Sequence, residues 1–300
     1  MAKKDLIIGA FSNYDYDAVK PWIESINQTD FDGDKVLITI NTSEETNQKI
    51  RDAGFTVIPK TSDGKMMFHM ERFHHLYNYL KDKKSHYRFI ITTDVRDVIF
   101  QKNPSYWLEN YMVDSNTRLV ASSEAIRIEN ESWNRDNITK CFGKELYEDI
   151  KKYEVLCVGT LAGYCEAVCD LCAMLFQLSS NRADWVADQA AYNVLMRMYP
   201  YNNASIVAKL EDAWALNAHV TNREAQYAEF GPHLLEERPY FDEEDGLVKD
   251  AKTKTPFVIV HQYDRVRVWK KFYEDKFNVK IKSQYTPDID DSVITFRTDI

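Results

Sequence analysis

Short apolar runs alternate with amphipathic segments through the first hundred residues of the chain. The runs are rich in β-branched residues, which is typical of buried strands, whereas the segments between them repeat apolar residues at helical spacing. The runs lie at residues 6–11, 36–40, 55–58 and 89–93, and the helical segments at 17–26, 44–53 and 65–80. Strands that alternate with helices in this way form right-handed parallel β-α-β units. The pattern therefore predicts an α/β fold with a mostly parallel central sheet flanked by helices.

The rest of the chain continues this pattern less regularly. Its expected strands lie at 119–123 and 256–261, its expected helices at 185–198 and 269–277, and its polar segments at 124–135 and 236–255. The run Val155–Gly163 predicts a strand that breaks at Gly159 into a buried helix beginning near Thr160. Asp184 is expected to cap the helix at 185–198. The two polar segments indicate a long loop and a solvated insertion or mobile lid.

Length and net charge limit the number of domains and the classes of ligand that the protein is expected to have. The 300 residues contain no repeat or low-complexity tract, which predicts one domain over 1–283 followed by a polar tail at 284–300. The net charge of −9 comes without a Lys/Arg-rich block, which argues against nucleic acid as the main partner. An anionic small ligand would therefore need local positive charge or a metal ion.

The N-terminal apolar stretch is too short for a signal peptide, and no run is long enough for a transmembrane segment. The five cysteines are an odd number without paired CxxC spacing, which fits buried thiols in a reducing compartment. We therefore expect a cytoplasmic protein.

One stretch places charges between two apolar runs. Asp94, Arg96 and Asp97 separate the strand at 89–93 from the run at 98–100. Charges there are costly to desolvate unless they bind something, and ligands of open α/β sheets bind beyond the carboxyl ends of the strands. We interpret the cluster as a site for a metal ion and the phosphates that it neutralises. The simpler alternative is a surface turn with a local Asp–Arg pair.

Further candidate residues lie at the ends of other predicted elements. They are Arg72 on the helix at 65–80, Glu124 at the exit of the strand at 119–123, Asp188 and Gln189 in the first turns of the helix at 185–198, and His261 at the end of the last strand. Each also has an ordinary structural explanation. Arg72 fits a solvated helix face, Asp188 is favoured by the helix dipole, and His261 fits a strand terminus.

Four signals occur in a recognisable order. They are Asp94-Val95-Arg96-Asp97 after a strand, Val158-Gly159-Thr160-Leu161-Ala162-Gly163 entering a helix, Ala187-Asp188-Gln189 opening another helix, and a late strand ending in His261. Over residues 5–275 this order resembles GT-A fold glycosyltransferases, most closely the glycogenin-type enzymes and related families with an Asp-x-Arg-Asp strand end. The resemblance implies a single GT-A (Rossmann-like) domain with a donor-binding half at about 1–104 and an acceptor-side half at about 105–283.

The resemblance also implies roles for the matched positions. Asp94 stands where the family's first motif carboxylate contacts the sugar nucleotide and its Mn²⁺ or Mg²⁺, and His261 matches a late histidine that ligates the metal. Arg72 matches a basic residue that reaches the diphosphate or donor sugar, and Asp188 and Gln189 match the pair bordering donor sugar and acceptor. Other expected contacts of the nucleotide sugar are Phe11, Asn13, Tyr14, Arg96, Gly159 and Arg265.

Two positions depart from the family pattern. Val158 stands where the family usually has Asn or Ser, and Arg96 replaces the second motif Asp, whose carboxylate appears one position later as Asp97. Three arrangements follow. Asp97 turns inward and completes the metal site, the metal is held without Asp97, or arginines neutralise the diphosphate without a metal. We expect the first.

These implications predict a glycosyltransferase that moves a sugar from a nucleotide-diphosphate sugar to a hydroxyl of a carbohydrate or glycoprotein acceptor, with retention favoured. The leaving diphosphate needs a divalent cation or fixed positive charge, and Asp188 or Glu124 would act at the reacting groups. Trp133 and Trp185 are expected on the acceptor side. Two other classes stay open. One is a nucleotidyltransferase that forms sugar nucleotides, which the Gly- and Lys-free loop at 12–15 disfavours, and the other is a catalytically silent carbohydrate-binding protein.

Overall fold

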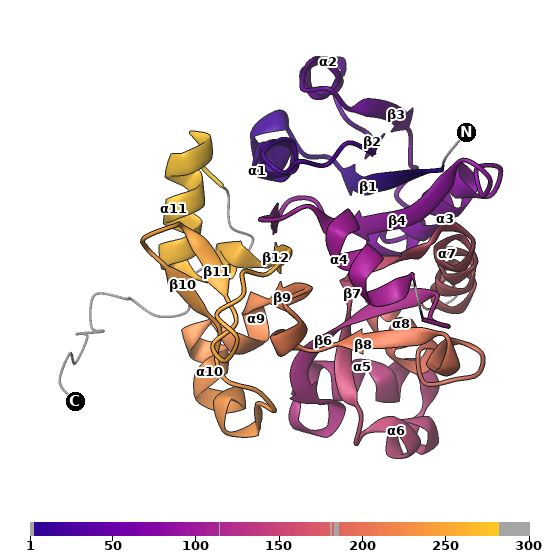
Figure 1. The fold of residues 1–300 in the computed structure, drawn as a ribbon. Coiled ribbons are helices and arrows are strands. Elements are labelled where there is room, and N and C mark those ends of the chain that lie inside the picture. The colour runs from indigo at the N-terminus through magenta and orange to yellow at the C-terminus, as the bar shows by residue number, and fades with distance from the viewer. Residues whose placement is uncertain (1–2, 114, 181, 183–185, 282–300) are drawn as a thin grey trace.

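The computed structural model describes residues 3–113, 115–180, 182 and 186–281, and its main feature is a seven-stranded sheet (Figure 1). The strand order is β3-β2-β1-β4-β7-β6-β8, and β7 runs antiparallel to both of its neighbours while the other pairs are parallel. The strands are β1 (Lys4–Ser12), β2 (Asp34–Ile40), β3 (Thr56–Lys60), β4 (Tyr87–Thr93), β6 (Leu119–Arg127), β7 (Glu154–Tyr164) and β8 (Ser205–Ala208). The mostly parallel α/β sheet predicted from the sequence is confirmed.

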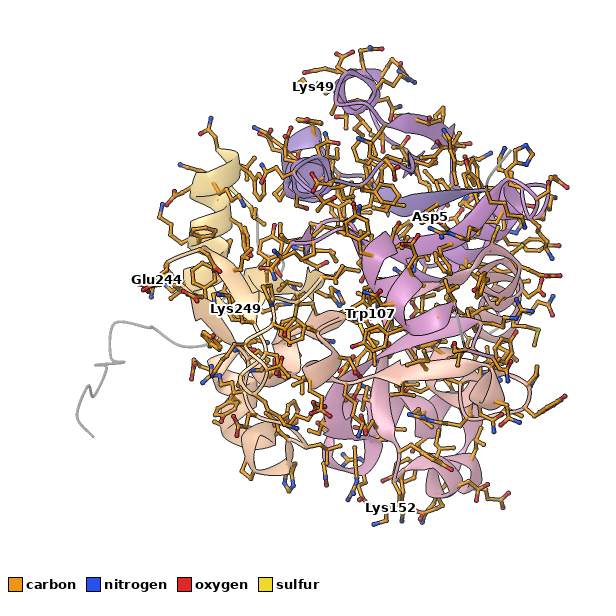
Figure 2. The ribbon with its side chains drawn as sticks, in the orientation of Figure 1. Asp5, Lys49, Trp107, Lys152, Glu244 and Lys249 are labelled. Atoms are coloured by element: carbon orange, nitrogen blue, oxygen red, sulfur yellow. The ribbon has the colours of Figure 1, made fainter. Side chains whose placement is uncertain are left out.

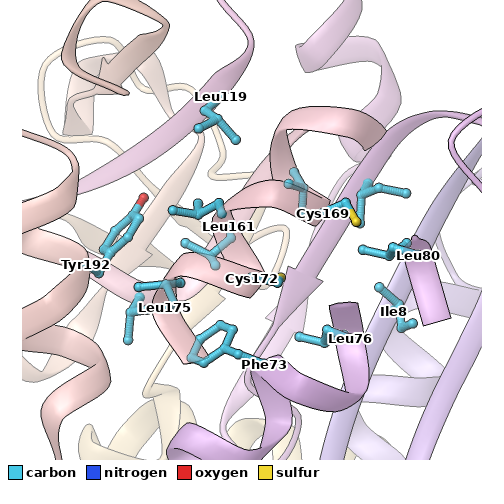
Figure 3. Close-up of a cluster of buried hydrophobic side chains, with 14 of the residues drawn as sticks. Ile8, Phe73, Leu76, Leu80, Leu119, Leu161, Cys169, Cys172, Leu175 and Tyr192 are labelled. Atoms are coloured by element: carbon cyan, nitrogen blue, oxygen red, sulfur yellow. The ribbon is translucent and has the colours of Figure 1, made fainter. Parts of the chain in front are cut away.

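Alternate side chains of the central strands enter two separate cores. In β1, Leu6 and Ile8 belong to one core, whereas Ile7 and Phe11 belong to the other. The first core is formed with α3 (Phe68–Leu80), α7 (Cys165–Ser179) and α8 (Ala187–Leu195). Figure 3 shows side chains from α3 and α7, among them Phe73 and Cys172, meeting over the sheet. The apolar residues at helical spacing in the segment 65–80 therefore form the face of α3 that covers the sheet.

The opposite face is covered by α1 (Tyr16–Asn27), α2 (Glu44–Asp52) and α4 (Pro104–Met112). Trp107 of α4 lies in the interior (Figure 2), where its indole N–H donates to the Asp212 carbonyl at 2.7 Å and its ring packs against Trp214. Charged side chains such as Lys49 and Lys152 lie at the periphery in the same view. Trp107 thus joins the central sheet to the C-terminal part of the chain.

The C-terminal part adds a second, smaller sheet beside the central one (Figure 1). Its order is β5-β12-β9, with β12 antiparallel to β5 and parallel to β9. The bounds are β5 (Val98–Phe100), β9 (Ala215–Asn217), β12 (Ile259–His261), α9 (Ala218–Thr221), α10 (Glu224–Phe230) and α11 (Arg267–Phe277). Because β5 follows the turn at 94–97, this sheet brings β12 to the charged motif.

Several sequence-based predictions of local structure are wrong. Residues 155–163 do not break into a helix at Gly159; β7 continues to Tyr164 because both of its edges are paired, with β4 and with β6. Gly163 has φ +156°, and a Cβ there would lie 2.3 Å from the Arg118 carbonyl oxygen. The glycine therefore allows β7 to lie close to the start of β6.

The polar segments also differ from expectation. The expected loop at 124–135 instead holds the end of β6 and the start of α5 (Ser132–Phe142), followed by α6 (Lys144–Ile150). The expected insertion at 236–255 holds a hairpin of β10 (Tyr240–Asp242) and β11 (Leu247–Lys249), anchored by Phe241 against Phe272 of α11. Asp184, Trp185 and the tail at 284–300 lie outside the described residues. No helix of the described chain is long and apolar enough to cross a membrane.

Candidate functional site

The charged motif forms a tight turn at the carboxyl end of β4. The Asp94 backbone N–H donates to the Gly159 carbonyl of β7 at 2.9 Å, and β5 begins at Val98. His261, the last residue of β12, pairs with Val98 in the antiparallel ladder. The backbone of two sheets therefore places His261 beside the turn that carries Asp94 and Asp97.

Asp94, Asp97 and His261 form a group with metal-ligand spacing. One ligand atom from each lies within 4.8 Å of the others. His261 Nε2 lies 3.3 Å from Asp94 Oδ2 and 3.9 Å from Asp97 Oδ1, yet this buried nitrogen has no aligned hydrogen bond within the described part of the protein. Two carboxylates and an imidazole suit a divalent cation such as Mn²⁺.

Gly159 makes this approach sterically possible. A Cβ at this position would lie 2.6 Å from His261 Cε1 and 2.9 Å from Asp94 Oδ2, closer than real Cβ contacts. Gly159 therefore leaves the space in which the imidazole and the carboxylate meet.

Arg72 of α3 links the turn to α8. Its guanidinium pairs with the Asp94 carboxylate and, at 3.1 Å, with Asp188 Oδ2. Burial favours the neutral carboxyl, but Arg72 and His261 outweigh it and hold the pKa of Asp94 well below its ordinary value. Burial raises the pKa of Asp188, and Arg72 offsets this only in part. Arg72 thus bridges the carboxylate on the β4 turn and the carboxylate on α8.

A second set of ion pairs holds Asp97 in place. Arg265 Nη1 lies 3.1 Å from Asp97 Oδ2 and also pairs with Asp264. Arg96 points to the same carboxylates, with Nη1 3.1 Å from Asp264 Oδ2 and Nη2 3.4 Å from Asp97 Oδ2. The other oxygen of Asp97 is the one nearer His261. Asp97 therefore turns inward, with Oδ1 toward His261 and Oδ2 toward the arginines.

Cys157 contacts the other side of the His261 ring. Its Sγ lies 3.3 Å from His261 Nδ1, and Asn217 Nδ2 lies 3.7 Å from the same sulfur. Burial raises the pKa of Cys157, and the contact with His261 opposes this in part. Burial alone lowers the pKa of His261, but Cys157 and the carboxylates of Asp94 and Asp97 raise it well above its ordinary value. The contact with Cys157 orients the ring so that Nε2 faces the carboxylates.

Gln189 and Glu124 form a further buried pair. The Val158 N–H donates to Gln189 Oε1 at 2.8 Å, and Gln189 Nε2 donates to Glu124 Oε1 at 3.3 Å. Glu124 lies within β6 rather than at its exit. Burial, with a smaller contribution from Glu131, raises the pKa of Glu124 to about 7. The departure at Val158 is therefore harmless to this network, because its backbone makes the contact.

These residues line one cavity of about 580 Å³. Twelve of the thirteen predicted site residues lie on its wall: Phe11, Tyr14, Arg72, Asp94, Arg96, Asp97, Glu124, Gly159, Asp188, Gln189, His261 and Arg265. Asn13 does not. Its side chain donates to Ser12 Oγ at 2.8 Å, and it lines a neighbouring cavity of about 860 Å³ beside α11, which shares Tyr14 and Arg96 with the first.

Several lining residues were missed from the sequence. They are His69, Glu131, Asn134, Cys157, Asn217 and His219. His69 precedes Arg72 by one helical turn, so that spacing is a signal that could have found it. Asn217 and Cys157 had no such signal, because β9 and the full length of β7 were not recognised.

No family model and no curated protein sequence matches this chain. Among solved structures, one with a similar fold is the galactosyltransferase LgtC in complex with donor and acceptor sugar analogues. Its TM-score is 0.51 at 13% sequence identity, and the match covers 85% of this chain and 86% of that chain. The likeness concerns the fold, and it confirms the expected GT-A class of α/β sheet.

Proposed function

We propose that this protein is a glycosyltransferase that moves a sugar from a nucleotide-diphosphate sugar to a hydroxyl acceptor with the help of a divalent metal ion. The observation that carries the proposal is the group of Asp94, Asp97 and His261 at the carboxyl end of β4, inside a cavity that also contains Arg72. Ligands of open α/β sheets bind at this edge. The similarity in fold to a galactosyltransferase supports the same class of reaction.

The residues present fit Mn²⁺ or Mg²⁺. Carboxylate oxygens suit both ions, and the imidazole favours Mn²⁺ of the two. His261 Nε2 is buried without an aligned hydrogen bond among the described residues, and Gly159 leaves room beside it. Asp94, Asp97 and His261 would hold the ion, which when bound supplies positive charge against the charge that develops on the leaving diphosphate.

The chain's own cations and hydrogen bonds would orient the donor. Arg72 is buried between Asp94 and Asp188, which supports a role for its fixed charge beside the diphosphate and the donor sugar. Arg265 fixes Asp97 through an ion pair. These ion pairs favour a positioning role for Arg72 and Arg265. Arg96 also pairs with Asp97 and Asp264 and helps to hold them in place.

Asp188 and Glu124 take different roles in this proposal. Asp188 Oδ1 is buried and lacks a hydrogen-bond partner in the described structure, and the residue lines the cavity, which supports a position beside the donor sugar. Glu124 lies behind Gln189, which it holds through a hydrogen bond. We propose transfer with retention, Asp188 stabilising the positive charge of the sugar ring and Glu124 supporting Gln189.

Release of nucleoside diphosphate from a panel of sugar nucleotides with Mn²⁺ tests this proposal. We expect turnover in the wild type, loss after chelation, and a loss of at least about two orders of magnitude in Asp94→Asn, roughly 3 kcal/mol of transition-state stabilisation. Asp82→Asn, an exposed aspartate outside the cavity, is the matched control and should retain full activity.

Other outcomes of the same assay would overturn the proposal. Formation of nucleoside triphosphate from sugar nucleotide and pyrophosphate would indicate a nucleotidyltransferase. Binding of sugar nucleotides without turnover, with every acceptor tried, would indicate a silent carbohydrate-binding protein.

A further inference from the structure

The first turn of α5 and its capping residue form a polar part of the cavity wall. Glu131 caps this helix, with Oε1 accepting from the Trp133 N–H at 3.2 Å and Oε2 from the Asn134 N–H at 2.6 Å. Oε2 also accepts from Asn134 Nδ2 at 2.7 Å. Glu131 thereby fixes the positions of the two side chains that follow it.

Asn134 keeps one unused acceptor in this wall. Because a carboxylate accepts hydrogen bonds, the amide nitrogen of Asn134 must face Glu131, and the amide oxygen is turned away from it. The residue is 3% exposed and lines the cavity, yet Oδ1 has no hydrogen-bond partner among the described residues. A buried acceptor without a partner is destabilising, and a hydroxyl donor of a ligand would relieve that cost.

Trp133 presents an apolar ring at the same place. It lines the cavity but is 47% exposed, unlike the indoles of Trp22 and Trp214, which are fully buried. Exposed aromatic rings at cavity walls typically contact ligands that have one apolar and one polar side. A sugar ring has that character, because its C–H groups form apolar faces and its hydroxyl groups lie around the edge.

The α5 turn has Glu124 and α8 as its neighbours. Glu131 is close enough to Glu124 to contribute to its raised pKa, and Glu124 accepts from Gln189 of α8. Helices α5 and α8 also share a core through Ile138 and Val194. The α5 turn therefore adjoins the Gln189–Glu124 pair on the cavity wall.

We propose that Trp133 and Asn134 form the acceptor subsite and that it takes a carbohydrate ring. The ring packs on the Trp133 indole, and one of its hydroxyl groups donates to Asn134 Oδ1. This inference rests on the proposed function for its assignment to the acceptor. The acceptor would then be a saccharide and not a serine, threonine or tyrosine hydroxyl of a protein.

Two measurements on Trp133→Ala, Trp133→Phe and Tyr106→Ala test the subsite. Tyr106 is 58% exposed and lies outside the cavity wall, so its variant is the matched control. The first measurement compares transfer to lactose, maltose, cellobiose and a serine-containing peptide with hydrolysis of the same sugar nucleotide by water. We expect Trp133→Ala to raise the KM for the preferred saccharide at least tenfold and to change donor hydrolysis much less than that. Trp133→Phe should retain most of the affinity.

The second measurement uses saturation-transfer difference NMR with the same three disaccharides and no donor. The signal should disappear in Trp133→Ala and weaken in Asn134→Ala, and it should persist in Tyr106→Ala. If the wild type releases no nucleoside diphosphate, the proposed function fails, whereas Trp133-dependent saccharide binding would still support the subsite. Equal saccharide KM and binding in wild type and Trp133→Ala, or transfer to the peptide alone, would overturn it.

Discussion

His261 Nε2 lies 3.3 Å from Asp94 Oδ2, although Asp94 follows β4 of the central sheet and His261 ends β12 of the second sheet, far along the chain. The contact arises because β5 follows directly from the turn that contains Asp94 and then pairs antiparallel with β12. The candidate metal site is therefore assembled at the junction of the two sheets. Its geometry depends on their backbone register as much as on the three side chains.

Gly159→Ala tests whether this junction needs an empty space. The new Cβ would lie 2.6 Å from His261 Cε1 and 2.9 Å from Asp94 Oδ2, so the two side chains must separate. We expect Mn²⁺ affinity to fall at least tenfold and stability to fall by about 1–3 kcal/mol. Gly231→Ala, outside the cavity wall, is the control, and calorimetric titration with thermal unfolding measures both effects. Unchanged metal affinity would show that the site does not depend on this approach.

The variant Asp188→Ala distinguishes a role of this residue at the donor sugar from a role at the diphosphate. Asp188 contacts the far side of Arg72, while Asp94 retains its own pairing with that arginine. We expect transfer to fall by two or more orders of magnitude, roughly 3 kcal/mol, with nucleoside diphosphate affinity changed only a few fold. Steady-state kinetics and titration of nucleoside diphosphate check this. An equal fall in both would mean that Asp188 serves only to hold Arg72.

The raised pKa of Glu124 predicts that the stability of the protein depends on pH. Its pKa is raised from 4.5 to about 7 in the folded protein, chiefly by burial, so the folded state holds a proton that the unfolded state has lost between these values. Stability from this group is therefore present below pH 4.5 and is lost as pH rises through 7. In metal-free buffer, the unfolding free energy of wild type minus that of Glu124→Gln should fall by about 2–3 kcal/mol between pH 5 and pH 8. Denaturant unfolding at several pH values measures it, and a flat difference would refute the raised pKa.

The sequence predicted the parts of the fold that follow from local pattern. Strands β1, β2 and β4 and helices α1 and α2 appeared where apolar spacing indicated them, because the strands are buried on both faces and each helix buries one face against the sheet. The continuation of β7 past Gly159 could not be read locally, since the run at 155–163 suits either a strand or a buried helix. The pairing of strands on both sides decided between them.

The candidate site likewise contains some residues that the sequence revealed and others that it did not. Asp94 and Asp97 were found because charges stood between two apolar runs, and His261 because the order of motifs resembled a known family. Cys157 and Asn217 escaped notice, because their place beside His261 depends on β7, β9 and β12 meeting at one edge. Long-range pairing of short strands leaves little trace in local sequence.

Mn²⁺ titration at a fixed concentration of nucleoside diphosphate, followed by electron paramagnetic resonance, tests the central claim most directly. The proteins are wild type, His261→Ala, Asp97→Asn and His233→Ala, an exposed histidine outside the cavity that serves as control. We predict at least tenfold weaker Mn²⁺ binding in the first two variants and wild-type binding in His233→Ala. The wild-type affinity should also fall as pH is lowered, because a ligand imidazole must lose its proton. Equal Mn²⁺ affinities in wild type, His261→Ala and Asp97→Asn would contradict the account.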